Sequence, residues 1–267
     1  MTAHVLALCN QKGGVGKTSI TVGLADVLAR QGRRVLVIDA DPQANATANL
    51  APDATPAFTL NDVLAGDPTT RQVAAGVITD AVMPAGDGWA GVDLVAAEPA
   101  LASREQDQDL GREYRLRTAV DGALDRWDVV LIDCPPNRGQ LTVNAITAAD
   151  AALLVTEPRA ASVDGLAQMT TTVATVRQHF HQDLRLAGVI VNKHRTDRRD
   201  RVDWVDQLRE DYGPRLLEPF VPDREVIAIA ASAAAPLSAY GSRARDVLDA
   251  LTALAAQIVP AEQPKQP

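Results

Sequence analysis

A short stretch of glycines and lysines near the start of the chain has the residue types needed to bind a polyphosphate. Residues 12–18 read Lys-Gly-Gly-Val-Gly-Lys-Thr and follow the apolar run 5–9. Glycines allow a tight turn whose backbone N–H groups point inward, and a following helix adds its positive end at the same place. Lys17 supplies a mobile cation, and the hydroxyl of Thr18 suits Mg²⁺. The stretch therefore predicts a phosphate-binding loop between a strand and a helix.

This loop departs from the usual phosphate loop at its first position. The usual pattern has a glycine where this chain has Gln11, and Lys12 follows. A dinucleotide-binding turn, read as Gly14-x-Gly16-x-x-Ser19, is the alternative, but it requires neither lysine. The residues expected to bind the phosphates are Gly13, Gly14, Val15, Gly16, Lys17, Thr18 and Ser19.

Aspartates follow two further apolar runs. Asp39 and Asp41 come directly after the run 35–38, and Asp133 ends the run 129–132. Aspartate is also common in ordinary turns at strand ends. However, the carboxyl ends of parallel strands meet at one edge of a sheet, so these carboxylates are expected beside the phosphate loop. Mg²⁺ prefers such oxygen ligands.

Strand-like and helix-like runs alternate through nearly the whole chain. This pattern predicts an α/β protein with one domain over residues 1–259, a mostly parallel twisted sheet and helices on both faces. The proline-containing tail 260–267 is expected to be disordered. The expected strands are 5–9, 35–38, 92–95, 129–132, 150–155, 186–191 and 216–221. The expected helices are 19–31, 58–64, 99–110, 113–124, 141–146, 162–180, 202–208, 226–235 and 242–259.

Composition limits the class of protein. With 46% hydrophobic residues the chain can form a full core, and a net charge of −8 argues against a generally basic nucleic-acid binder. The longest mostly apolar run, 226–237, is too short to span a bilayer, and no secretory segment is evident. Cys9 and Cys134 are expected to be buried thiols in a reducing compartment, because an iron–sulfur site needs more ligands or two chains. We therefore expect a cytoplasmic protein.

The string with two lysines resembles the deviant Walker A motif of the ParA/MinD ATPases, and within them the Soj-like ParA proteins. Residues 39–43, Asp-Ala-Asp-Pro-Gln, match that family's Walker A′ motif, and 133–136, Asp-Cys-Pro-Pro, match the end of its Walker B strand. The family usually has glycine at the position of Ala44 and Ser-Leu-Gly at 137–139, which here is Asn-Arg-Gly. The resemblance is strongest before residue 160. It implies a P-loop NTPase fold and Mg²⁺-dependent ATP hydrolysis that is slow and stimulated by a partner protein.

The resemblance also implies roles for individual residues. Lys12 would reach the phosphates of the partner subunit in an ATP-sandwich homodimer, and Asp41 would orient the attacking water, so Lys12, Lys17 and Asp41 form the expected catalytic set. The residues expected to hold the metal are Thr18, Asp39 and Asp133. The residues expected to contact the adenine are Asn192, Pro222 and Asp223.

A basic stretch could contact DNA. Residues 193–201 hold five basic and two acidic residues, and a solvated loop is an equally good interpretation of such a run. The residues expected to contact DNA are Lys193, Arg195, Arg198, Arg199, Arg201 and Arg224.

Three functions remain open at this point. The resemblance favours a ParA-type ATPase that binds DNA non-specifically as an ATP dimer, associates with the nucleoid, responds to a ParB-like partner and segregates a plasmid, a chromosome or another cargo. A MinD-like membrane-cycling ATPase needs a basic amphipathic C-terminal helix, whereas the last helix carries Asp246 and Asp249, so no membrane partner is expected. A metabolic ATP-dependent enzyme on the same fold shows no substrate motif.

Overall fold

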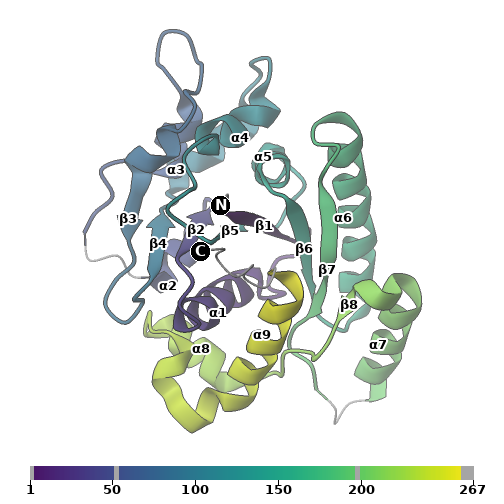
Figure 1. Cartoon of the computed structure of the whole chain (residues 1–267). Coiled ribbons are helices and arrows are strands. Elements are labelled where there is room, and N and C mark those ends of the chain that lie inside the picture. The colour runs from purple at the N-terminus through teal and green to yellow at the C-terminus, as the bar shows by residue number, and fades with distance from the viewer. Residues whose placement is uncertain (1–2, 51–53, 196–198, 260–267) are drawn as a thin grey trace, which may run out of the picture.

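The strands of this protein form one twisted sheet. The computed structural model describes residues 3–50, 54–195 and 199–259, with the side chains of 160–163 and 199–201 outside that description. Within these residues eight strands are ordered β3-β4-β2-β5-β1-β6-β7-β8 (Figure 1). All neighbouring pairs are parallel except β3 with β4. The strands are β1 (His4–Cys9), β2 (Val35–Asp39), β3 (Val82–Pro84), β4 (Val92–Val95), β5 (Val129–Asp133), β6 (Ala151–Thr156), β7 (Arg185–Val191) and β8 (Leu216–Leu217).

Alternate residues of the central strands pack against two different helix layers. In β1, Ala7 and Cys9 point into one hydrophobic cluster, while Leu6 and Leu8 point into the other. The strands read as continuous apolar runs because both faces of a parallel sheet are covered. Both clusters consist mainly of aliphatic side chains, as the low aromatic content of 3% requires.

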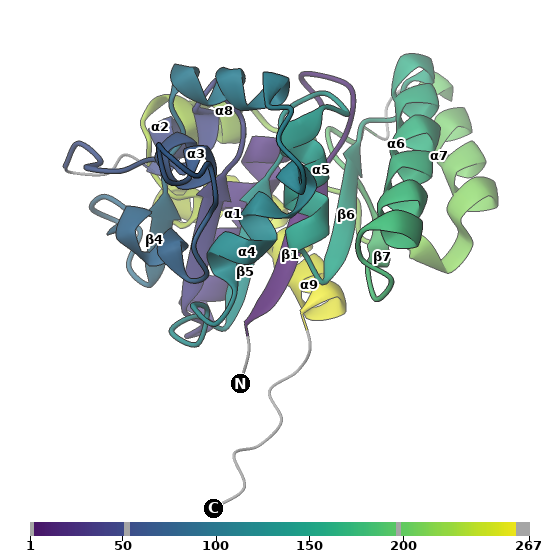
Figure 2. The same cartoon turned by 90° about the horizontal axis from the view of Figure 1, so that it is seen from above.

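The helices form a layer on each face of the sheet. In Figure 1, α1, α8 and α9 lie below the sheet and α3, α4 and α5 above it, with α6 at the right. Figure 2 shows α6 and α7 side by side at one end of the molecule. The α-helices are α1 (Lys17–Arg30), α2 (Asn45–Leu50), α3 (Leu60–Ala65), α4 (Arg115–Val120), α5 (Gln140–Ala148), α6 (Ala160–His179), α7 (Arg199–Tyr212), α8 (Glu225–Ser232) and α9 (Arg245–Ile258). The predicted mostly parallel sheet with helices on both faces is confirmed.

Two predicted helices are wrong in type or length. The segment 99–110 forms a 3₁₀ helix over Pro99–Gln106, and 113–124 divides into a 3₁₀ turn, Arg112–Tyr114, and the short α4. The buried guanidinium of Arg115 explains this geometry, because it donates to the carbonyl of Leu64 and to carboxylates of the 107–109 turn. These long-range contacts outweigh local helix propensity.

The region 54–91 contains elements that the sequence pattern does not reveal. Helix α3 starts at Leu60 rather than at 58, because Thr59 and Asp62 form a capping box. A 3₁₀ helix, Val77–Ala81, leads into the edge strand β3, which is antiparallel and ends in proline. Three residues are too few for a period-two pattern to be recognised. The final predicted helix, 242–259, divides into a 3₁₀ segment, Leu237–Ala244, and α9.

Close packing joins α1, the helix that follows the phosphate loop, to α9. A Cβ atom added at Gly23 would lie 2.7 Å from Cδ1 of Leu251, so only glycine fits the present packing. Asp26 on the same helix accepts hydrogen bonds from the backbone N–H and hydroxyl of Ser238, each 2.8 Å. The C-terminal segments therefore pack against the middle of α1.

The two cysteines of the chain lie at the ends of adjacent strands, since Cys9 is the last residue of β1 and Cys134 directly follows β5. Cys9 and Cys134 are fully buried, and their Sγ atoms are 3.2 Å apart. Burial raises the pKa of the Cys134 thiol well above its ordinary value. The prediction of buried thiols is confirmed.

Candidate functional site

The loop between β1 and α1 forms a cradle of backbone groups. Gly14 and Gly16 have φ of +80° and +87°, a left-handed conformation that glycine adopts without strain. A Cβ atom at Gly16 would also lie 2.2 Å from Nδ2 of Asn192, which donates a hydrogen bond to the carbonyl of Val15 at 2.9 Å. The left-handed turn leaves the N-terminus of α1 open to a ligand.

A buried asparagine fixes the start of this loop. Asn10 is fully buried, and its Nδ2 donates to the carbonyl of Val155 on β6 at 2.6 Å. Its Oδ1 accepts from the backbone N–H of Lys12 at 3.0 Å. Sequence analysis did not identify Asn10, although a polar residue that directly follows a buried strand was a usable signal.

The carboxylate at the end of β5 contacts the first turn of α1. The hydroxyl of Thr18 donates to Oδ2 of Asp133 at 2.6 Å, and the hydroxyl of Thr21 donates to Oδ1 at 3.0 Å. Burial raises the pKa of Asp133 to about 6, opposed by the Thr18 hydrogen bond, the charge of Lys17 and the Thr21 hydrogen bond. The Thr18 hydroxyl and this carboxylate form an oxygen donor set of the kind that Mg²⁺ prefers, so the residues fit the metal.

Asp39 lies opposite Asp133 in the register of β2 and β5. Its Oδ2 accepts hydrogen bonds from both the backbone N–H and the hydroxyl of Thr47 at 2.8 Å, and its Oδ1 accepts from the N–H of Asp41 at 3.1 Å. Burial, followed by the charge of Asp133, raises the pKa of Asp39 to about 7. A divalent cation would offset the repulsion between these two buried carboxylates.

Asp41 lies in the turn after β2 and lines the cavity described below. Its Oδ1 accepts from the backbone N–H of Gln43 at 3.0 Å, and the side chain is 7% exposed. The same turn contains Ala44, whose φ of +55° is left-handed. The turn thus holds the Asp41 carboxylate through the backbone N–H of Gln43, while Asp39 holds the backbone of Asp41.

The first lysine of the motif lies outside the cavity. Nζ of Lys12 is 3.0 Å from Oε1 of Glu157, and the two side chains are 31% and 7% exposed. Burial raises the pKa of Glu157, but the Lys12 hydrogen bond and the charges of Lys12, Arg159 and Lys193 outweigh it, so the pKa is lowered overall. Lys12 is therefore paired with an ionised glutamate of its own chain.

A cavity of about 480 Å³ opens at the phosphate loop. Of the residues predicted to bind ligand, it is lined by Gly13, Gly14, Gly16, Lys17, Thr18, Ser19, Asp41, Asn192 and Asp223. The other predicted residues, Lys12, Val15, Asp39, Asp133 and Pro222, do not line it. Pro222 instead forms an isolated bridge with His194, and Val15 is buried in the core. The cavity brings most of the predicted phosphate residues together.

Two helices that sequence analysis did not assign to the site also line this cavity. Helix α2 contributes Asn45 and Asn49, and α8 contributes Ile227, Ala228 and Ala231. The spacing of these residues by three or four was a usable signal, since it places them on one helix face. Oδ1 of Asn192 is buried without a hydrogen-bond partner in the described residues, so an acceptor remains for a ligand that donates.

The predicted DNA-contacting residues occupy several different environments. Arg224 is paired with Asp246 at 2.7 Å and lines the cavity. Nζ of Lys193 donates to the carbonyl of Gly14 at 2.5 Å, and Arg195 lies 4.0 Å from Asp223. Arg198 lies outside the described residues, as do the side chains of Arg199 and Arg201.

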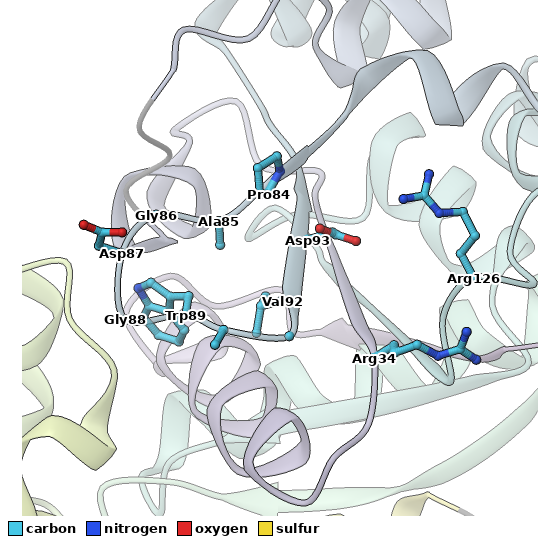
Figure 3. Close-up of a pocket in the computed structure, with 12 residues that line it drawn as sticks. Arg34, Pro84, Ala85, Gly86, Asp87, Gly88, Trp89, Val92, Asp93 and Arg126 are labelled. Carbon is cyan, nitrogen blue, oxygen red and sulfur yellow. The ribbon is translucent and has the colours of Figure 1, made fainter.

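A larger hollow of about 600 Å³ lies at the opposite edge of the sheet, where β2 and β4 begin. Figure 3 shows Arg34 and Arg126 at one side of it, Asp87 and Trp89 at the other, and Asp93 between them. Arg34 is paired with Asp128 at 2.7 Å. Because no predicted site residue lines this hollow, its size alone does not make it the functional site.

Comparison with known proteins finds a matching family and similar relatives. A family model described as an AAA domain, AAA_31, matches residues 3–186. The sporulation initiation inhibitor protein Soj of Bacillus subtilis is 30% identical over 244 residues, covering 90% of this chain and 92% of Soj. The chromosome partitioning protein ParA of Caulobacter vibrioides is 35% identical over 270 residues, covering 98% of this chain and 96% of that ParA.

Solved structures share the fold. Cobyrinic acid a,c-diamide synthase from Mycobacterium smegmatis with bound ADP and magnesium has a TM-score of 0.72 and 32% identity, covering 86% of this chain and 91% of the synthase. A Cyanothece McdA variant in complex with ATP has a TM-score of 0.82 and 23% identity, covering 98% of this chain and 99% of McdA. This similarity shows the fold alone. With its two-lysine phosphate loop and these relatives, the chain belongs to the ParA/MinD family of P-loop ATPases.

Proposed function

We propose that this chain is a ParA-type ATPase that forms an ATP-sandwich dimer, binds DNA non-specifically and moves a plasmid, a chromosome or another cargo. Hydrolysis would be slow and stimulated by a ParB-like partner. The observation that carries the proposal is the phosphate cradle, which is preceded in the chain by a second lysine, Lys12. ATP with Mg²⁺ is the ligand proposed for the cavity. The location proposed with this function is the cytoplasm, in association with the nucleoid.

Residues of the cavity support phosphoryl transfer to water. The backbone N–H groups of the loop and Nζ of Lys17 would neutralise charge that develops on the phosphates. Thr18 and Asp133 would hold Mg²⁺, which would offset negative charge on the phosphates. Asp41, fixed by the backbone of its turn, would orient the attacking water. Asn192, Pro222 and Asp223 are proposed for the adenine, supported by the free acceptor on Asn192.

Lys12 supports the dimer. In the single chain its Nζ is paired with Glu157 at 3.0 Å, outside the cavity. In the proposed dimer this lysine would move to the phosphates of the facing subunit, so the active site would be complete only when two chains close around two nucleotides. ATP favours the dimer to the extent that it binds that state better, and hydrolysis removes the difference.

DNA binding rests on the basic run 193–201. Because α9 places Asp246 against Arg224, we assign the DNA contact chiefly to Arg195, Arg198, Arg199 and Arg201. A dimer would double this local charge despite the net −8 of the chain. Contacts to phosphates release counterions, so the affinity must fall steeply with salt.

The test measures nucleotide binding, oligomeric state and DNA retention with ATP, ADP and no nucleotide at two salt concentrations. Lys17→Ala is expected to abolish ATP binding.

Two variants test the dimer. Asp41→Ala is expected to bind ATP and stay dimeric on DNA, and Lys12→Ala is expected to bind ATP as a monomer. The double variant Arg199→Glu with Arg201→Glu should lose DNA while keeping ATP-dependent dimers. An Asp41→Ala protein that stays monomeric with ATP, or wild-type protein without DNA affinity at low salt, contradicts the proposal.

A metabolic role on the same fold is the second candidate, since one relative of 32% identity is a diamide synthase. The same assays separate the two. A metabolic enzyme should bind ATP without DNA retention, and its turnover should depend on a small acceptor rather than on DNA. A MinD-like role would instead show as ATP-dependent co-sedimentation with liposomes. None of the described helices has the length and hydropathy of a membrane span.

A further inference from the structure

A carboxylate outside the known motifs holds the loop that follows Asp133. Residues 134–139 connect β5 to α5, and Glu105 lies in the 3₁₀ helix Pro99–Gln106, far away in sequence. Oε2 of Glu105 accepts the backbone N–H of Gln140 at 2.5 Å, and Oε1 accepts from Nδ2 of Asn137 at 3.2 Å. The Glu105 side chain thus bonds both to the loop, at Asn137, and to the first residue of α5, Gln140.

The loop is built to receive this carboxylate. Gly139 has an ordinary φ of −77°, so its backbone does not require glycine. A Cβ atom there would lie 2.2 Å from Oε2 of Glu105, and the glycine is therefore needed for the approach of Glu105. Asn137 completes the arrangement, because its Oδ1 accepts the N–H of Gly139 at 2.8 Å and its carbonyl accepts the hydroxyl of Thr142 at 3.0 Å.

The clamped loop reaches the phosphate cradle. Pro136 lines the nucleotide cavity, and its Cβ would be 3.8 Å from a Cβ added at Gly13.

The segment that carries Glu105 begins at Ala97, which is connected to the carboxylate of Asp39. The N–H of Ala97 donates to Oγ1 of Thr47 at 2.9 Å, and that hydroxyl donates to Asp39. The segment 97–105 therefore connects Thr47 of α2, and through it Asp39, to the loop after β5.

We propose that Glu105 is a positioning residue for ATP hydrolysis, because it sets the place of the loop 134–139 between Asp133 and the phosphate cradle. Glu105 touches no part of the cavity itself, so its effect passes through Asn137, Gly139 and Gln140. The inference rests on the proposed ATPase activity for its kinetic consequence, whereas the clamp exists in the free protein.

Steady-state kinetics and hydrogen exchange test this role. Glu105→Ala should lower kcat about tenfold, the size expected for losing one charge-assisted hydrogen bond, with KM for ATP within about twofold of wild type. Glu105→Gln should restore most of kcat, since its amide oxygen can still accept the N–H of Gln140. Glu113→Ala is the matched control, because among the described contacts Glu113 pairs only with its half-buried neighbour Arg112.

A double variant makes the test specific to the clamp. Gly139→Ala should lower kcat to a similar degree, and combining it with Glu105→Ala should cause no further fall, because the displaced carboxylate is already gone. In the free protein, amide exchange over 137–140 should accelerate in Glu105→Ala and stay unchanged in Glu113→Ala.

The outcomes separate the inference from the proposed function. Unchanged kcat and unchanged exchange in a folded Glu105→Ala protein overturn the positioning role. A Glu105→Ala protein in which kcat, ATP affinity and melting temperature all fall also overturns the positioning role, because that pattern indicates general destabilisation. If wild-type protein neither binds nor hydrolyses ATP, the proposed function fails, and the exchange experiment alone still decides whether Glu105 orders the loop.

Discussion

Ala44 adopts a backbone conformation that favours glycine, at a position where the family usually has glycine. Its φ of +55° lies directly before α2, in the turn that presents Asp41. A Cβ atom in the left-handed region crowds the following carbonyl, at a cost of about 1–2 kcal/mol. The chain tolerates this strain within the turn that carries its proposed water-orienting residue.

Ala44→Gly should therefore stabilise the protein. The gain in the free energy of unfolding is expected to be about 0.5–1 kcal/mol, because glycine relieves the strain but also gains entropy in the unfolded chain. Urea denaturation measures it. Ala48→Gly, at an exposed position inside α2, is the control and should instead cost about 1 kcal/mol. Equal losses from both substitutions would contradict the strain at Ala44.

Single residues were predictable from sequence where their chemistry is local. Lys17, Thr18 and the loop glycines follow from spacing within one short motif, and the cavity brings them together. The contacts of Asn10, Glu105 and Lys12 were not predictable, because their partners lie 145, 35 and 145 residues away. A one-dimensional pattern contains no information on contacts of that range.

At the scale of elements, an ion pair joins the starts of β2 and β5. Asp128 accepts two side-chain hydrogen bonds and one backbone hydrogen bond from Arg34. The Arg34 side-chain hydrogen bond is the main cause that lowers the pKa of Asp128 to about 2. The folded state therefore favours the ionised carboxylate.

The stability given by this pair should depend on pH. A carboxyl with a lowered folded pKa stabilises fully above its unfolded pKa of about 4 and loses that contribution as the pH falls towards 2. Wild type should thus unfold at higher urea than Asp128→Asn at pH 6. The difference should shrink between pH 4 and pH 2, as urea titrations at several pH values will show. A difference that stays constant over this range would argue against the pair.

Packing between α1 and α9 gives a second prediction at this scale. In an exposed helix, Gly→Ala gains about 1 kcal/mol, but here the new Cβ would overlap the buried side chain of Leu251. Gly23→Ala should therefore destabilise the protein by about 1–3 kcal/mol. In a Leu251→Ala background the same change should become stabilising, and a thermal-unfolding cycle of the four proteins measures this reversal. Destabilisation in both backgrounds would exclude the proposed contact as the cause.

The reliability of the predicted elements followed the strength of their patterns. The central strands were predicted well because each is a continuous apolar run between turn residues. The predicted helices 99–110 and 113–124 were wrong in type or length. The first is a 3₁₀ helix over Pro99–Gln106, and only Arg115–Val120 of the second is α-helical, where Arg115 bonds to carboxylates of the 107–109 turn. Strand β3 was missed, since it exists through its pairing with β4.

At the scale of the whole molecule, the order of the strands explains why the site is where it is. β5 lies between β1 and β2, so the phosphate loop, Asp133 and Asp39 meet at neighbouring carboxyl ends. The sequence motifs predicted this convergence, because each follows a parallel strand. They did not predict the second wall of the cavity, which α8 brings from the other end of the chain.

The paired thiols in the middle of the sheet give the molecule an internal reporter. Cys9 and Cys134 are the only cysteines, and both are fully buried, so Ellman's reagent should label native protein only when β1 and β5 separate. Labelling should then yield two equivalents together rather than one after the other, and saturating nucleotide should slow it, because a ligand of the native state makes opening rarer. Rapid labelling of a single equivalent in folded protein would mean that the centre of the sheet opens locally. Absorbance of the released dye can thus follow the lifetime of the native fold without any engineered probe.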